Sequence, residues 1–271
     1  MSTPGKVTYS EYLKVPTLLD QQQCLTPGTH DELQFIIVHQ VYELWFKLVL
    51  HEIDEIQRLV DDGSAVSLRG AVRLARRVHE IFRVLVLQIH VLETMRPTDF
   101  LKFRSALNPA SGFGSVQFRE TEVALGLKDR ELASHAAGDP RYPQLLARLD
   151  APSLVDSFYA RLQALGLDVT PPSPERTPEQ ERETIAAIKT IYDNPDDHAT
   201  VYELCEALVD VDEQLILWRR HHVMMVERHI GLKPGTGKDI TGGTDGIRYL
   251  AKTFARRAFD DLWAVRSVLT D

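Results

Sequence analysis

The sequence contains little cysteine and no disulfide pattern. Its two cysteines, Cys24 and Cys205, lie far apart and form no CxxC pair, so we expect neither a disulfide framework nor a cysteine-rich metal site. A chain of 271 residues buries enough apolar surface to fold without such cross-links. This cysteine usage is typical of a reducing compartment, and we expect the protein to be cytoplasmic.

Long apolar runs and an excess of positive charge are also lacking. No apolar run approaches the roughly 20 residues that span a bilayer, and the N-terminal MSTPGKVTYSEY has no apolar core of a signal peptide. The formal net charge is -8, which argues against wide contact with nucleic acid. We therefore expect neither a membrane nor a nucleic acid among the partners.

Several familiar catalytic motifs are absent or broken. The glycine-rich stretch 231–246 lacks P-loop spacing, because Leu232 stands where the first glycine is required. After His51, Glu55 stands where a zinc protease has its second histidine. Neither G-x-S-x-G nor a cysteine nucleophile with an evident partner is present. The glycine-rich stretch is then either a mobile loop over a substrate or an ordinary solvent loop.

The hydrophobic pattern predicts an all-α protein. Apolar residues recur at helical spacing through most of the chain, and alternating β-branched runs are almost absent. We expect one domain over residues 1–271, a bundle of long helices. The proline-rich residues 167–178 are predicted to form an exposed loop within it. The predicted helices cover 31–60, 67–95, a segment from about 97, 116–125, short pieces within 129–164, then 178–194, 198–230 and 247–269.

The first long helix begins with unusually apolar turns. Leu33 and the run FIIV at 35–38 leave almost no polar face there, so this part is predicted to be buried on several sides. Asp31 or Thr29 can cap its N-terminus.

Two histidines lie on apolar faces of predicted helices. His39 shares a face with Phe35 and Tyr42, and His222 follows Trp218 by one turn. A histidine on an apolar helix face can hold a haem iron and leave its other side open, and without a CxxCH motif such a haem would be noncovalent. Taken alone, His39 is more commonly a core residue bonded to a backbone carbonyl, and His222 a structural or solvated histidine.

Arg104 is a third candidate. It follows the apolar FLKF and precedes a Ser111-Gly112 turn, so it can form a bidentate clamp for a carboxylate. An ordinary ion pair is the alternative.

Together these segments resemble one family, the tryptophan 2,3-dioxygenases, in the same order over nearly the whole chain. Any one segment is weak, but their joint order and spacing are specific. The matching segments are TYSEYL at 8–13, HDELQFIIVHQ at 30–40, ELWFK at 43–47, VLETM at 91–95, FR at 103–104, PASGF at 109–113, LVD at 208–210, WR at 218–219, His222 and GTG at 235–237.

The resemblance implies an all-α enzyme, usually a homotetramer, with a pocket for noncovalent haem b that is ferrous in the active form. Such enzymes insert O2, their co-substrate, across the indole C2–C3 bond of L-tryptophan and give N-formylkynurenine, the entry to the kynurenine pathway. By position, His222 is similar to the axial iron ligand and His39 to the histidine that hydrogen-bonds the indole N–H. Arg104 matches the carboxylate clamp, and Thr236 matches a loop residue that binds the substrate's ammonium and carboxylate.

Further positions follow from the same resemblance. Phe35 matches an aromatic wall of the pocket, and Ser111 matches a polar contact on the haem side. Tyr9 and Tyr12 match the N-terminal segment 1–20, which in this family reaches into a neighbouring subunit's site.

The sequence departs from the family pattern at three places. Residues 238–241 intervene before the second glycine cluster, Phe100 stands where many bacterial members have a tyrosine that assists the clamp, and Gly114 replaces a usual glutamine. Phe100 is therefore a further candidate substrate contact. These departures leave two alternatives open: mono-oxygenation of the indole of a modified, for example β-substituted, tryptophan in secondary metabolism, and a haem or tryptophan sensor without catalysis.

Overall fold

The computed structural model describes residues 7–108, 114–231 and 256–270. Across these ranges the regular secondary structure is helical and contains no strand, which confirms the all-α prediction. The helices are α1 (Tyr9–Leu13), α2 (Val15–Leu19), α3 (Asp31–Asp62), α4 (Ala65–Glu93), α5 (Pro97–Arg104), α6 (Val116–Leu125), α7 (Arg130–Ser134), α8 (Tyr142–Asp150), α9 (Leu154–Ala164), α10 (Pro178–Asp193), α11 (Ala199–Ile230) and α13 (Asp260–Ala264), with 3-10 turns η1 (Ser105–Leu107) and η3 (Val265–Val268).

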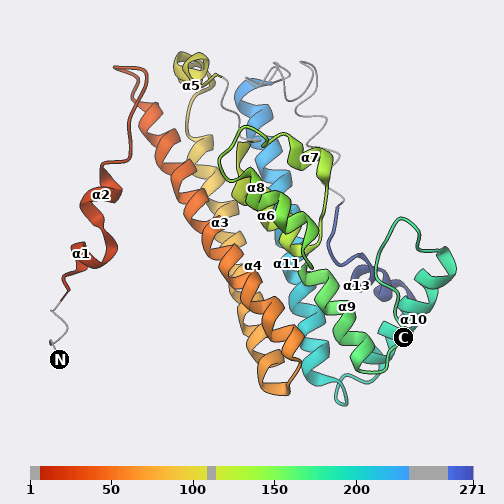
Figure 1. The fold of residues 1–271 in the computed structure, drawn as a ribbon. Helices are drawn as coiled ribbons and strands as arrows, with labels where there is room; N and C mark the ends of the chain where they lie inside the picture. Colours follow the sequence, from red (N-terminus) through yellow and green to blue (C-terminus); the bar gives the residue numbers. More distant parts are fainter. Residues whose placement is uncertain (1–6, 109–113, 232–255, 271) are drawn as a thin grey trace.

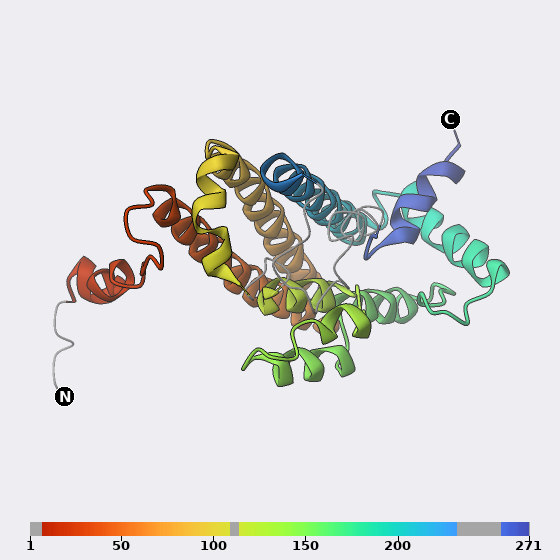
Figure 2. The ribbon, with the colours of Figure 1, turned by 90° about the horizontal axis from the view of Figure 1, so that it is seen from above.

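Three long helices, α3, α4 and α11, form the centre of the molecule (Figure 1). Helix α4 packs against both α3 and α11, while α6 and α9 cover α3. Figure 2 shows the same arrangement from above, with α5 crossing the ends of the long helices. Apolar residues three or four apart, such as Ile53, Ile56 and Val60, are buried between the helices. Burial of each side chain of this size stabilises the fold by about 1.5–3 kcal/mol.

The turn between α3 and α4 follows from local sequence. Gly63 ends α3 with a left-handed φ of 67°, which glycine adopts without steric cost. Ser64 then caps α4, its side chain accepting a hydrogen bond from the amide of Ser67.

The start of α3 differs from the prediction. Neither Thr29 nor Asp31 caps it: the residue before the helix is His30, and no side-chain cap is present. Instead the buried Glu32 carboxylate accepts the amides of Leu25 and Thr26 at 2.7 and 2.8 Å. The preceding chain is therefore fixed from inside the helix, by a contact that propensity alone does not reveal.

The expected burial of the first turns of α3 is also wrong for the single chain. Leu33 and Ile37 are 44% and 43% exposed, because α4 and α5 cover this part from one side only. Helix α3 is long and apolar enough, by length and composition alone, to cross a membrane. Its opposite face packs in the bundle, as core helices of soluble proteins also do.

The C-terminal helix predicted over 247–269 is interrupted. Its first part lies outside the described residues, and residues 256–259 are not helical. The amides of Ala258 and Phe259 donate to the Asp212 carboxylate, each at 2.9 Å. Helix α13 therefore begins only at Asp260.

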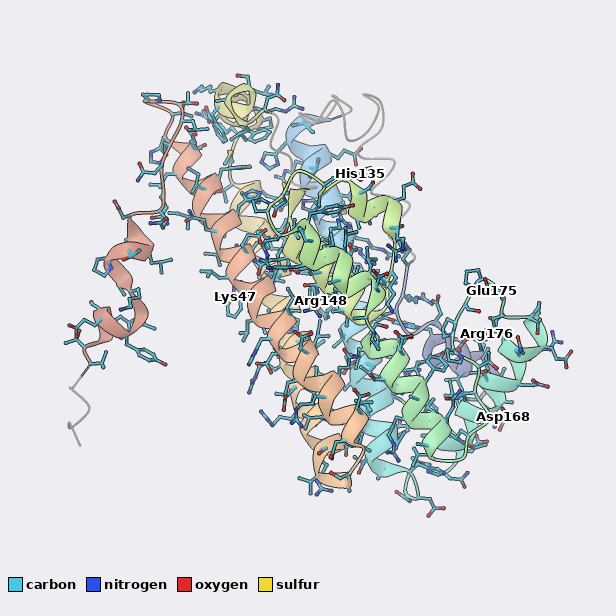
Figure 3. The ribbon with its side chains drawn as sticks, viewed as in Figure 1. Lys47, His135, Arg148, Asp168, Glu175 and Arg176 are labelled. Atoms are coloured by element: carbon cyan, nitrogen blue, oxygen red, sulfur yellow. The ribbon has the colours of Figure 1, made fainter. Side chains whose placement is uncertain are left out.

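The proline-rich segment between α9 and α10 carries no regular helix. Asp168, Glu175 and Arg176 lie along it in Figure 3. It is not exposed throughout, since Val169 is buried and the Arg176 guanidinium pairs with Asp261 of α13 at 2.8 Å. The single domain over 1–271 stays a prediction.

Candidate functional site

His39 lies in the first half of α3, one turn after Phe35. Its Nδ1 is 2.7 Å from the Phe35 carbonyl oxygen, and the two ring centroids are 4.0 Å apart. Because a carbonyl only accepts, we assign the proton to Nδ1, which leaves a lone pair on Nε2. Burial lowers the pKa of His39, although the bond to Phe35 and the charge of Glu43 act in the opposite direction. The imidazole is therefore a neutral group with one free acceptor.

Aromatic residues of α5 extend the wall beside Phe35. The Phe35 ring lies 5.8 Å from Phe100 and 5.5 Å from Phe103, and the last two meet edge to face at 5.4 Å. Arg104, the last residue of α5, directly follows the buried Phe103 and is itself partly buried. The structure thus brings His39, Phe35 and Phe100 together. Arg104 lies at the end of the same helix as Phe100.

His222 lies on α11 and stacks on Trp218, with centroids 5.1 Å apart and planes 5° from parallel. Its surroundings lower its pKa to about 4, chiefly through burial, and proximity to His39 and Arg119 adds to the effect. The residue as a whole is partly buried. Among the described residues nothing hydrogen-bonds either ring nitrogen. His222 is therefore a neutral imidazole with a nitrogen available to a ligand.

The two histidines belong to one aromatic cluster. Tyr42 of α3 lies 6.3 Å from His39 and 6.2 Å from Trp218, measured between ring centroids. Its hydroxyl donates to the Leu85 carbonyl of α4 at 3.0 Å, which fixes the ring. The titration of His39 and that of His222 are coupled, because each charged form disfavours the other, and such an effect requires proximity.

A buried group of charges lies beside His222. We call it the ion triad: Arg119 and Glu122 of α6 with Arg219 of α11, all nearly inaccessible. Glu122 Oε1 accepts from Arg219 Nε at 3.1 Å, and Glu122 Oε2 accepts from Arg119. Burial raises the pKa of Glu122, but the two arginine charges outweigh it, and the pKa lies below its ordinary value. Among the described residues two guanidinium groups thus share one carboxylate, and Arg219 makes a further interaction beyond this triad.

Sequence reasoning missed the ion triad. Arg219 lies in the WR segment but received no role, and Arg119 and Glu122 lie on a helix whose ten residues are all buried. The available signal was charge at helical spacing within a short helix that a serine caps. That signal is weak, because the same pattern is typical of an exposed helix.

Tyr9 and Tyr12 are not brought to this cluster within one chain. Tyr9 and Tyr12 are 76% and 77% exposed on α1, which with α2 extends away from the bundle (Figures 1 and 2). The segment after α2 is tied to α3, for example by Gln22 donating to Gln40 at 2.6 Å. Thr236 and Ser111 lie outside the described residues.

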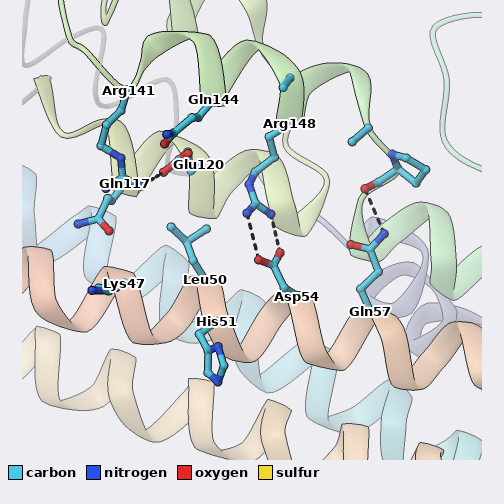
Figure 4. Close-up of a pocket in the computed structure, with 13 residues that line it drawn as sticks. Lys47, Leu50, His51, Asp54, Gln57, Gln117, Glu120, Arg141, Gln144 and Arg148 are labelled. Carbon is cyan, nitrogen blue, oxygen red and sulfur yellow. Dashed lines mark hydrogen bonds and ion pairs between the residues drawn. The ribbon is translucent and has the colours of Figure 1, made fainter.

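A separate groove of about 830 Å³ lies between α3 and helices α6 and α8 (Figure 4). Two ion pairs cross it, Arg148 with Asp54 at 2.6 Å and Arg141 with Glu120 at 2.7 Å. Four of its charged side chains are already paired in this way, and none of the predicted site residues is among its lining, so the histidine cluster is the better candidate site. In the described part of the chain, no group of three or more His, Cys, Asp or Glu side chains could hold a metal ion.

Comparison with known proteins agrees with this geometry. A profile described as tryptophan 2,3-dioxygenase matches residues 1–144 and 175–269. The chain is 43% identical over 272 residues to the tryptophan 2,3-dioxygenase of Herpetosiphon aurantiacus, covering 97% of this chain and 98% of the relative. Identity to the proteins of the same name is 41% for Caulobacter vibrioides (97% and 98% covered) and 42% for a Nocardioides species (98% and 96% covered). The chain therefore belongs to the tryptophan 2,3-dioxygenase family.

Proposed function

We propose that the protein is a haem-dependent tryptophan 2,3-dioxygenase, an oxidoreductase that converts L-tryptophan and O2 into N-formylkynurenine. The observation that carries this proposal is the pairing of two neutral histidines in one aromatic cluster. His222 has no described hydrogen-bond partner for its ring nitrogens, and His39 keeps one free acceptor. Full-length similarity to proteins named tryptophan 2,3-dioxygenase supports the same reaction.

The described residues fit a haem. A neutral imidazole is the form that binds iron, and the lowered pKa keeps His222 in that form above about pH 4. Trp218 and Phe118, 4.5 Å apart between centroids, provide an apolar wall. The two guanidinium groups of the ion triad suit the carboxylates that a haem carries. His222 would hold the iron and Arg119 would balance a carboxylate. When bound in its ferrous form, haem supplies the binding and activation of O2.

The chain's own residues would bind and orient the substrate. The Nε2 lone pair of His39 accepts a hydrogen bond from the indole N–H, because Nδ1 already donates to Phe35. His39 thereby orients the ring without removing a proton. The rings of Phe35 and Phe100 pack on the indole and exclude water.

Recognition of the amino-acid end falls to Arg104 and Thr236. The planar guanidinium of Arg104 can hold a carboxylate through two hydrogen bonds, and the Thr236 hydroxyl can contact both the ammonium and the carboxylate. Phe100 has no hydroxyl with which to assist, so Arg104 carries more of the carboxylate binding. Fixing both ends of the substrate converts encounter into orientation. L-tryptophan or a close derivative with a free carboxylate fits this arrangement.

A homotetramer and a cytoplasmic location are parts of the same proposal. Tyr9 and Tyr12 are exposed on an arm that leaves the bundle, and Leu33 and Ile37 form an uncovered apolar face on α3. Both features support contact with further copies of the chain, with segment 1–20 reaching a neighbour's site. Light scattering on the haem-loaded protein measures the mass directly, and a monomer would contradict this part.

Product mass tests the reaction. Haem-loaded, reduced protein is mixed with L-tryptophan and ¹⁸O₂, and the product is weighed by mass spectrometry. Two labelled oxygen atoms support the dioxygenase. One labelled atom points to mono-oxygenation of the indole, and a tryptophan-induced shift of the Soret band without product points to a sensor. Either of the last two results refutes the proposal.

Variants of the histidines test the assignment of roles. His222→Ala is expected to abolish the Soret band, whereas His221→Ala, its neighbour on α11, is the matched control and the rival ligand. His39→Ala is expected to retain haem and to bind tryptophan less tightly. A Soret band that survives in His222→Ala but not in His221→Ala would show that the wrong ligand was assigned.

A further inference from the structure

The chain returns to helix α11 in a stretch that we call the anchored segment, residues 256–259. Its backbone meets α11 at two places. The Asp212 carboxylate accepts the amides of Ala258 and Phe259, each at 2.9 Å, and Arg219 Nη1 donates to the Arg256 carbonyl at 2.9 Å. Asp212 and Arg219 lie seven residues apart, so they share one face of α11.

The Asp212 carboxylate suits the two adjacent amides of the anchored segment. A carboxylate is a short side-chain group that presents two acceptors side by side, and consecutive N–H groups match it. Asp212 is 1% exposed and Phe259 is 1% exposed. Phe259 packs edge to face on Phe158 of α9 at 5.7 Å. Such an ionisable group is costly to bury unless its hydrogen bonds are made, and here both oxygens are used.

We propose that Asp212 is a positioning residue for the haem-ligand end of α11, acting by holding the anchored segment over Arg219 and the ion triad. Arg219 donates to the Arg256 carbonyl and to Glu122, among other contacts. Glu122 in turn binds Arg119, whose charge acts on His222. Asp212 itself touches neither the histidines nor the pocket, so its effect passes through this chain of contacts.

Release of the anchored segment opens the ion triad to water. Arg219 then loses a carbonyl partner, and water weakens the field of the two guanidinium groups at His222. We expect haem, which carries carboxylates, to bind less tightly, while helix α11 stays folded. This part of the inference rests on the proposed function, since it concerns haem.

The test compares Asp212→Asn with Asp210→Asn in the full chain. Asp210 is the matched control, because it is exposed and lies two residues earlier on the same helix. Asparagine keeps one acceptor but turns a donor toward the second amide. Hydrogen exchange followed by mass spectrometry reports the amides of Ala258 and Phe259. We expect Asp212→Asn to exchange there at least about tenfold faster, the loss expected for a hydrogen bond to a charged group, and Asp210→Asn to match the wild type.

The second readout is the rate at which haem passes from the protein to apomyoglobin. We expect haem loss about tenfold faster in Asp212→Asn and unchanged in Asp210→Asn. Unchanged exchange in Asp212→Asn overturns the anchoring, and faster exchange with unchanged haem loss overturns the positioning role.

Arg256→Ala gives an independent approach if Asp212→Asn fails to fold. It removes the partly exposed ion pair between Arg256 and Asp129, 2.9 Å long, and so loosens the anchored segment from its other side. Both readouts should change in the same direction but less. No change in either readout refutes the inference. If the wild-type protein binds haem but leaves tryptophan unaltered, the proposed function is refuted and the positioning role is not, because neither readout depends on turnover.

Discussion

Replacement of Glu122 by glutamine tests the ion triad most directly. The substitution keeps the size of the side chain and removes its charge. The side chains of Arg119 and Arg219 are 9% and 4% exposed, so two buried guanidinium groups would lose their counter-charge. Removal of one partner from a buried ion pair costs about 3–5 kcal/mol. We expect the free energy of unfolding of the haem-free protein to fall by about that amount.

Urea unfolding measures this change, with fluorescence as the probe and the m-value checked for constancy. The matched control is Glu55→Gln, because Glu55 pairs with Arg58 on the surface, where the side chains are 40% and 63% exposed. An exposed pair contributes about 0–1 kcal/mol. If haem carboxylates balance the triad, the haem-loaded Glu122→Gln protein should recover part of the loss.

The stability difference between wild type and Glu122→Gln should also depend on pH. The pKa of Glu122 lies below its ordinary value, so its stabilising effect is present above the ordinary carboxyl range and is lost as the pH falls. The difference between wild type and Glu122→Gln should therefore shrink in acid. A loss no larger than that of Glu55→Gln at neutral pH would refute the reasoning, since the two guanidinium groups would then have adequate partners without Glu122.

Three further predictions concern residues around the site. Burial raises the pKa of Asp212 to about 6. The contribution of this side chain to the free energy of unfolding is therefore full below the ordinary carboxyl pKa, and it is lost as the pH rises through 6. The wild type should thus lose up to about 3 kcal/mol relative to Asp212→Asn between pH 4 and 7, and a flat difference in urea titrations would contradict the assignment. Gly126→Ala should destabilise by about 2 kcal/mol or more, because the φ of 126° disfavours a side chain and the new Cβ would lie 2.6 Å from a Val155 atom; Gly138→Ala, with open space around it, is the control in thermal unfolding. Tyr42→Phe should cost about 1 kcal/mol by removing the hydroxyl that donates to an α4 carbonyl, with an unchanged Soret band; a lost band would mean that the hydroxyl has a role in haem binding.

Those parts of the fold that depend on neighbouring residues were predictable from sequence. Helix α6 occupies Val116–Leu125 as predicted, because a serine cap precedes it and Gly126 follows. Gly63 ends α3, and Pro97 and Pro178 open α5 and α10. Each of these signals acts within one helical turn, so a single sequence contains all of it.

Contacts between distant residues explain the errors. The helix predicted from 247 fails at Ala258 and Phe259 because Asp212, 46 and 47 residues earlier, accepts their amides. The outward Leu33 and Ile37 are exposed because no described helix covers that side of α3. Periodicity indicates that a face is apolar, but it does not identify the element that covers it.

The candidate site likewise has a part that the local sequence indicates and a part that depends on contacts between distant residues. His39 and His222 were visible as histidines on apolar faces, yet that pattern alone fits a core histidine equally well, and the family resemblance was needed to choose. The tertiary structure adds a reason of its own. Helix α6 contributes two charged residues to the ion triad and α11 contributes one, and only the packing of the two helices brings these buried charges together. A buried ion pair is costly unless its partners meet in good geometry. The meeting of these three charges is thus a property of packed helices, which no local motif contains.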